Sequence, residues 1–200
     1  MNRIFLTLAV VSNLLLGGSF VLGLGIDVGS TPDQAALASS AIRLHLLTGV
    51  LSLVLVMLVH AIVLTYFMGT GRWIEETSQA YRLGEGFFER GRQLKHSVIP
   101  KLSAGVLLPV LLVPTGAMAD PASPLGLPVW VGFSASTVHF MSAGTLVILN
   151  ILINVAEYGV ISQNAEVIDE VMGEVRRIRS EHGMTVEQDA PDSQHTPDPV

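Results

Sequence analysis

The stretch LHLLTGVLSLVLVMLVHAIVLTYFM, residues Leu44 to Met68, decides the fold class of this chain. Its 25 residues include no Asp, Glu, Lys or Arg, and its only imidazoles are those of His45 and His60. A helix rises about 1.5 Å per residue, so a helix of this length crosses the roughly 30 Å apolar core of a bilayer with some tilt. Ionisable side chains are costly at that depth, so both histidines are candidates for a functional site.

The composition excludes a soluble single domain. Half of the 200 residues are hydrophobic, only 14% are charged, and the mean hydropathy is +0.54. Soluble domains carry about 25% charged residues. Cysteine is absent, which excludes disulfides, thiolate metal sites, iron–sulfur clusters and covalent c-type haem. Any cofactor must therefore be held by histidine, methionine, carboxylates or shape.

Four apolar runs predict an all-α fold, an integral membrane four-helix bundle. The expected spans cover about residues 4–26, 41–68, 102–119 and 129–155. The first run is longer than the 7 to 15 residues typical of a signal-peptide core, so we expect an uncleaved span.

The segments outside the spans predict further helices. Segment 69–100 mixes charges with aromatic and aliphatic residues, which predicts one or two short amphipathic helices lying at the membrane interface. Segment 156–182 carries Val167, Val171 and Val175 at helical spacing and predicts a cytoplasmic helical extension of the 1–182 domain. The polar tail 183–200 is expected to be disordered.

The basic residues predict the orientation. Arg3 precedes the first span, six Lys or Arg residues lie between spans two and three, and three arginines follow span four. Only Arg43 lies on the other side of the predicted spans. By the positive-inside rule, both termini are expected to be cytoplasmic in a multi-pass protein of the cell membrane.

Two histidines predict a cofactor site. His45 lies 13 residues after Pro32 and His139 lies 11 residues after Pro128, and proline favours the first turn of a helix. If both helices start level, the imidazoles differ in depth by about 3 Å and can face each other. Imidazoles from facing helices of a bundle can ligate a haem iron, so we expect one b-type haem between them, with Arg43 beside a propionate.

The glycines of the spans, among them Gly49, Gly105 and Gly144, could let a helix backbone approach a flat macrocycle. The alternative is that His45 and His139 are interfacial or hydrogen-bonded histidines without a ligand. A second haem at His60 is not expected, because no other span offers a histidine at its depth.

His60 lies about 12 Å from the cytoplasmic end of its span. Amide side chains at similar depth predict a polar layer that hydrogen-bonds across helices, at ~0.6 kcal/mol per contact; they belong to Asn13, Asn150 and Asn154. The alternative is a proton or quinone site, with Glu157 and Tyr158 connecting His60 to water.

These patterns together predict a membrane subunit that binds one haem b and passes electrons between a quinone and a partner protein, without independent catalytic activity. Two alternatives stay open: a cofactor-free accessory or scaffold protein that docks to other membrane or peripheral subunits of a larger complex, and a small transporter. Nucleic acid is not an expected partner, because the basic residues of segment 69–100 alternate with acids.

The orientation is tested with reporter fusions. A reporter fused after Glu85 is expected to be cytoplasmic and one fused after Asp120 extracytoplasmic, because the basic residues flank the first point and not the second. Activity of paired alkaline phosphatase and fluorescent-protein fusions measures this. The opposite labelling would contradict the orientation.

Overall fold

The computed structural model describes residues 1–26, 31–120, 123–124 and 132–184. This part of the chain forms four helices and no β-strand, which confirms the all-α prediction. The helices are α1 (Asn2–Leu24), α2 (Pro32–Ala80), α3 (Glu85–Ala119) and α4 (Ala135–Glu181). The tail from residue 185 onward lies outside the described residues.

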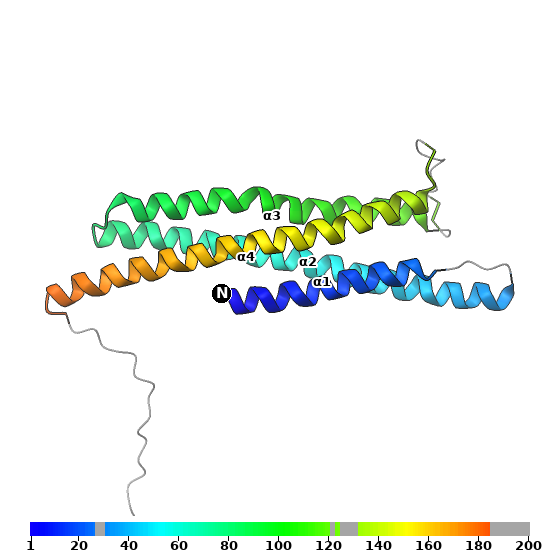
Figure 1. The fold of residues 1–200 in the computed structure, drawn as a ribbon, viewed down its shortest axis with the longest axis horizontal. Coiled ribbons are helices and arrows are strands. Elements are labelled where there is room, and N and C mark those ends of the chain that lie inside the picture. Colours follow the sequence, from blue (N-terminus) through cyan, green and yellow to red (C-terminus); the bar gives the residue numbers. More distant parts are fainter. Residues whose placement is uncertain (27–30, 121–122, 125–131, 185–200) are drawn as a thin grey trace, which may run out of the picture.

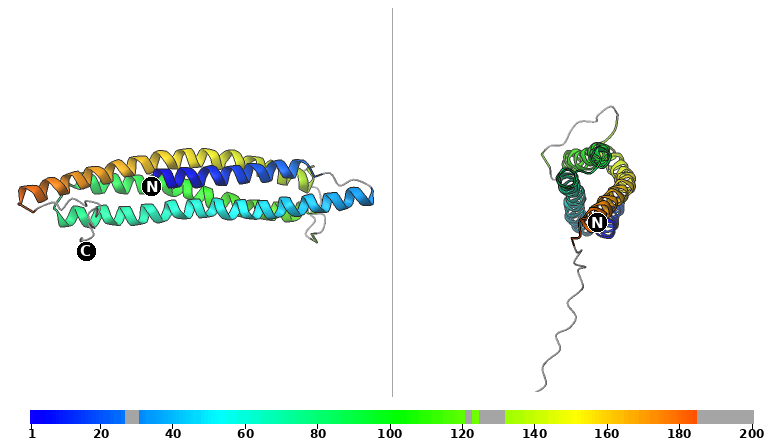
Figure 2. Two further views of the ribbon diagram at one scale, coloured as in Figure 1. Left: turned by 90° about the horizontal axis from the view of Figure 1, so that it is seen from below. Right: turned by 90° about the vertical axis from the view of Figure 1, so that its left-hand side faces the viewer.

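The helices pack as an elongated four-helix bundle (Figures 1 and 2). Each helix packs against the next along the chain, and α4 also packs against α1. Helices α2 and α4 touch across one diagonal, whereas α1 and α3, as far as they are described, do not touch across the other. Side chains from all four helices therefore reach the core. Of the two diagonal pairs, only α2 and α4 contact each other directly.

The four helices are each long and apolar enough to cross a membrane. They present aliphatic side chains outward, including Leu14 (70% exposed), Leu47 (65%), Leu111 (64%) and Val155 (68%). Helices can span a bilayer because they satisfy their backbone hydrogen bonds internally, and lipid covers such an apolar exterior. The chain is thus a multi-pass membrane protein with a lipid bilayer around it.

The starts of α2 and α4 differ from the expected level arrangement. Helix α2 begins at Pro32, where Thr31 and Gln34 form a reciprocal capping box. Helix α4 begins only at Ala135, where the Ser134 side chain accepts a hydrogen bond from the Thr137 amide at 3.1 Å. The expected start at residue 128 lies outside the described residues. The first turns of α2 consequently project beyond the rest of the bundle (Figure 2).

The segment 69–100 forms helix, but its two parts continue α2 and α3 instead of forming separate short helices. Residues 69–80 continue α2 and residues 85–100 begin α3, with a turn between them. Their apolar side chains pack against the α4 extension, in a cluster centred on Ile74, Val167, Val171 and Val175. The expected interfacial residue Trp73 packs at the edge of this cluster. An amphipathic face can be covered by lipid or by protein, and here the α4 extension covers it.

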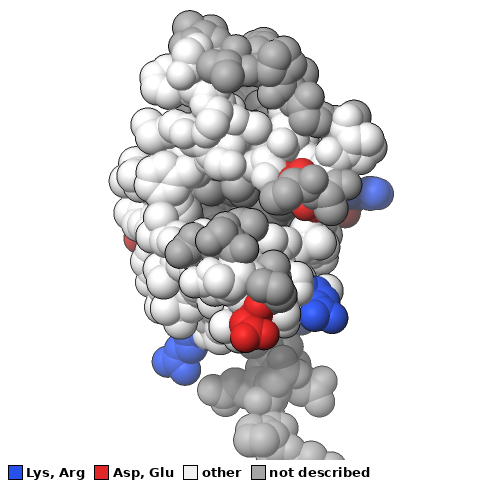
Figure 3. Space-filling model, turned by 90° about the vertical axis from the view of Figure 1, so that its right-hand side faces the viewer, with Lys and Arg blue, Asp and Glu red and all other residues white. Residues whose placement is uncertain are grey.

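Basic residues gather at one end of the bundle. We call this the basic end: it holds the turn between α2 and α3 and the last turns of α4. There Arg90 of α3 forms an ion pair with Glu170 of α4, and Arg177 forms ion pairs with Glu174 and Glu181. The hydrogen bonds from Arg177 hold the pKa of Glu174 below its usual range. Figure 3 looks onto the opposite end, where few charged residues are visible.

The packing of Ile74 predicts the stability of the basic end. Ile74 is fully buried, and Ile74→Ala should destabilise the protein by about 2–5 kcal/mol because it leaves a cavity among the α4 valines. Met172→Ala on α4 is the control, since Met172 is 38% exposed. Denaturant unfolding in lipid nanodiscs, with hydrogen exchange of residues 69–90, measures the change. Equal stability of both variants would contradict the packing described.

Candidate functional site

His45 is fixed by the neighbouring helix α1. Its Nδ1 lies 2.9 Å from the Ser19 carbonyl oxygen, and the Ser19 hydroxyl donates in return to the His45 carbonyl at 3.4 Å. A carbonyl oxygen can only accept, so Nδ1 carries the proton. The ring lies against Gly23, where a Cβ would come within 2.9 Å of His45 Cε1. Glycine is therefore required at position 23 for the imidazole to lie where it does.

His139 is fixed in the same way by α3. Its Nδ1 lies 3.1 Å from the Thr115 hydroxyl, which donates its own hydrogen to the Leu112 carbonyl at 2.7 Å. The hydroxyl must therefore accept from Nδ1, which again carries the proton. Gly116 lies beside this ring, with a would-be Cβ 3.2 Å from His139 Cε1. Both imidazoles thus have the same tautomer and the same kind of glycine contact.

The two rings meet across the α2–α4 diagonal. Their centroids are 6.1 Å apart and their planes are nearly perpendicular, at 82°. Neither Nε2 atom forms a hydrogen bond with any residue that the structure describes. With Nδ1 protonated, each Nε2 carries a free lone pair, which is the form in which histidine binds metals. The structure therefore brings His45 and His139 together as two ligand-competent imidazoles.

The two rings are spaced so that they could ligate one metal ion. With each metal–nitrogen bond at roughly 2 Å and each nitrogen ~1 Å from its ring centre, two imidazoles on one metal hold their centroids about 6 Å apart, close to the 6.1 Å observed. In the described part of the chain, no group of three or more His, Cys, Asp or Glu side chains could hold a metal ion.

The remaining residues expected at this site lie as follows. Arg43 is exposed on α2, two residues before His45, and makes no ion pair with a described residue. Gly49 faces the Ser19 hydroxyl and Gly144 faces the Phe20 ring, so neither contacts a histidine. The sequence reasoning missed Gly23 and Gly116; each lies within about one turn of the polar residue that holds the ring, and this spacing is a usable signal.

His60 stands at the centre of a second, inner site. Its Nδ1 lies 2.9 and 3.1 Å from the two carboxylate oxygens of Glu157, and its Nε2 lies 3.3 Å from Asn150 Oδ1. The Asn150 amide in turn donates to Asn13 Oδ1 at 2.9 Å, and the Asn13 amide donates to the Ala9 carbonyl at 2.7 Å. This chain of contacts joins α1, α2 and α4.

The direction of each hydrogen bond follows from the Ala9 carbonyl. A backbone carbonyl only accepts, so Asn13 must present its amide to it and its Oδ1 to Asn150. Asn150 then presents Oδ1 to His60, so His60 Nε2 carries a proton. The one proton left to place lies between Nδ1 and Glu157. The pair is therefore neutral overall, as imidazolium with carboxylate or as imidazole with carboxylic acid.

This pair is sealed inside the bundle. His60 is 1% and Glu157 0% exposed. Gly105 of α3 closes one side, since a Cβ there would lie 2.5 Å from Cδ2 and 2.6 Å from Cε1 of His60. Apolar clusters lie on both sides along the bundle, one around Val63 and Ile161 and the other around Leu146. A charge imbalance in such a place would be costly, and the neutral pair avoids it.

Two other expected residues of this layer behave differently. Asn154 is only 6% exposed, yet neither its amide nitrogen nor its carbonyl oxygen has a hydrogen-bond partner among the described residues. Tyr158 is 40% exposed on the outer surface of α4 and does not join the network. The structure thus brings together His60, Asn13 and Asn150 and adds Glu157 as the direct partner of His60.

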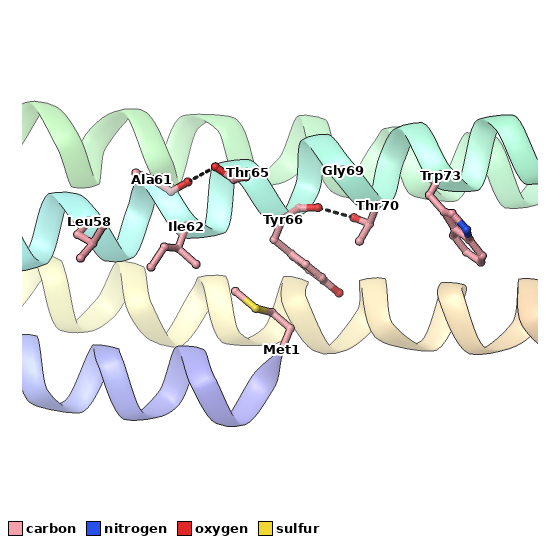
Figure 4. Close-up of a pocket in the computed structure, with 9 residues that line it drawn as sticks. All are labelled: Met1, Leu58, Ala61, Ile62, Thr65, Tyr66, Gly69, Thr70 and Trp73. Atoms are coloured by element: carbon pink, nitrogen blue, oxygen red, sulfur yellow. Dashed lines mark hydrogen bonds between the residues drawn. The ribbon is translucent and has the colours of Figure 1, made fainter. Parts of the chain in front are cut away.

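An apolar groove of about 630 Å³ lies on the outside of the bundle, beside the start of α1 (Figure 4). Its lining includes Met1, Tyr66 and Trp73, and the hydroxyls of Thr65 and Thr70 in it donate to carbonyls of their own helix. His60 is not part of this lining. The groove therefore has no described contact with the buried pair.

No protein-family model matches the chain, and no similarity to a curated protein or to a solved structure was found. The site is therefore interpreted from its own geometry.

The contact between Gly105 and His60 is tested with an added methyl group. Gly105→Ala should displace the imidazole and lower the stability by about 1–3 kcal/mol, because the ring has no room to keep its hydrogen bonds. Gly159→Ala is the matched control on α4, where a Cβ meets nothing within 4 Å. It should be neutral or stabilising, since alanine favours helix by about 1 kcal/mol over glycine. Thermal unfolding in detergent measures both; equal melting would contradict the contact.

Proposed function

We propose that this protein is a membrane subunit that binds one haem b through His45 and His139 and takes part in electron transfer. The observation that carries the proposal is the pair of imidazoles 6.1 Å apart, each with its Nδ1 hydrogen-bonded to a neighbouring helix and its Nε2 free. Histidines with only a packing role have no need of two free acceptor nitrogens at the same place.

The chain's own residues would hold the ligand by fixing the rings in advance. The Ser19 carbonyl and the Thr115 hydroxyl set the tautomer of each imidazole, and such outer partners also raise the basicity of the ligating nitrogen. Gly23 and Gly116 give the rings room against α1 and α3. Arg43 would offer a cation to a propionate near the membrane boundary. When bound, the haem supplies a one-electron carrier in an apolar setting.

The proposal extends to the setting of the protein. The basic end would face the cytoplasm, with both termini there and the haem site nearer the other face of the cell membrane. An electron carrier needs a donor and an acceptor, and we propose a membrane quinone and a partner subunit for these roles.

Absorption spectroscopy tests the proposal. Protein produced with ample haem should show a Soret band that shifts on reduction, and His45→Ala or His139→Ala should abolish it because one axial ligand is lost. Thr115→Val should keep the band but weaken haem affinity by roughly 10–100-fold, since it removes an outer partner of His139.

The control is His182→Ala, because His182 is exposed at the end of α4 and bonds only the Ile178 carbonyl. It should leave the spectrum unchanged. A colourless wild-type protein under full haem supply would contradict the proposal. It would favour a cofactor-free scaffold that docks through the long α4 extension.

A further inference from the structure

Polar side chains follow the buried face of α4 toward the basic end. They recur at spacings of four, three and seven residues, which places them on one side of a helix; they are Asn150, Asn154, Glu157 and Asn164, all at most 6% exposed. Amides and a carboxylate are expensive inside a membrane bundle and each needs a reason to be there. Asn150 and Glu157 both contact His60, and the Asn164 amide donates to the Thr70 hydroxyl at 3.0 Å.

Asn154 is the exception in this line. It lies between the two residues that contact His60, and both polar atoms of its side chain are buried without a partner among the described residues. Buried amides are almost always hydrogen-bonded, to protein or to an internal water molecule. No described side chain reaches Asn154, so an internal water molecule is the remaining hydrogen-bond partner for its side chain.

The His60–Glu157 pair can take up one proton without rearranging its neighbours. The bond from Nε2 to Asn150 is fixed by the chain of amides, and only the proton between Nδ1 and Glu157 is free to move. Uptake of a proton would give imidazolium beside carboxylic acid, in which Nδ1 still donates to a carboxyl oxygen. An ionisable pair of this kind inside a membrane bundle is a candidate proton-binding site.

Apolar side chains enclose the pair toward both ends of the bundle. Toward the basic end, a layer that includes Val63, Phe67 and Ile161 separates it from the bond between Thr70 and Asn164. Toward the opposite end lies the second cluster around Leu146.

We propose that His60 and Glu157 form a proton-binding site, and that Asn154 holds a water molecule beside it. The proposal does not depend on haem at the other histidine pair.

Few other ionisable groups lie near the His60–Glu157 pair. Helix α1 has none between Arg3 and its end, and α3 has none after Lys101, which lies one turn before Gly105 and bonds the Ser97 carbonyl. On α2 the next ionisable residue toward the basic end is Tyr66, and on α4 it is the outward-facing Tyr158. A titration seen inside the bundle at this level therefore belongs to the pair.

Infrared difference spectroscopy of the whole protein in lipid nanodiscs tests the proposal. A carboxyl or imidazolium band should change with pH, shift in D2O, move in Glu157→Asp and vanish in Glu157→Gln. If the Gln variant does not fold, the Asp variant still assigns the band, since it keeps the carboxyl group and shortens its reach. Absence of a pH-dependent, D2O-sensitive band that follows position 157 would overturn the proposal.

The rate of exchange into D2O tests the water at Asn154. Asn154→Leu should slow exchange by about tenfold, the effect of losing one buried hydrogen bond on a rate. An unchanged rate in Asn154→Leu would overturn the proposed role of this residue.

Discussion

Lipid offers no hydrogen bonds, and this constraint organises the interior of the bundle. Most polar side chains that enter a span therefore find a partner inside the protein. The chain meets this requirement by ending its hydrogen bonds on backbone carbonyls: Asn13 on Ala9, His45 on Ser19, and Thr115 on Leu112. A carbonyl oxygen only accepts, so the side chain that bonds to it must be the donor. This fixes the direction of each further hydrogen bond in the same chain of contacts. The tautomers of His45 and His139, and the proton on Nε2 of His60, can therefore be derived from heavy-atom positions alone.

The same derivation separates two roles for histidine in one protein. His60 has partners for both ring nitrogens, an amide oxygen and a carboxylate. His45 and His139 each have a partner for one nitrogen only, and both rings are less deeply buried than His60. A saturated imidazole can hold helices together or exchange a proton, whereas the unsaturated pair at 6.1 Å leaves two nitrogen lone pairs available to a ligand. The two sites therefore differ in their partners and in their burial.

The spans could be predicted from the sequence because an apolar run of this length has few other uses. The approach of His45 to His139 was also expected, but from a wrong premise: the helices do not start level, and α2 begins well beyond the described start of α4. Glu157 was expected only as a link from His60 to water; its direct contact with His60 could not be derived, since this depends on how α2 and α4 are rotated about their axes. Nor does a list of glycines reveal that positions 23, 105 and 116 are those packed against imidazole rings. Amphipathicity does not distinguish a lipid surface from a protein surface. The sequence therefore could not show that the helices of segment 69–100 pack on α4.

Both histidine sites bridge the α2–α4 diagonal, and they lie about 22 Å apart along α2, from His45 to His60. At an effective dielectric constant of about 20, a unit charge added at one site changes the energy of a charge at the other by less than about 1 kcal/mol. That is below the ~1.4 kcal/mol that corresponds to a tenfold change in an equilibrium. Electrostatics alone therefore couples the two sites only weakly. A strong linkage between electron and proton binding would need the helices themselves to move, and α2 and α4 are the helices that carry both sites.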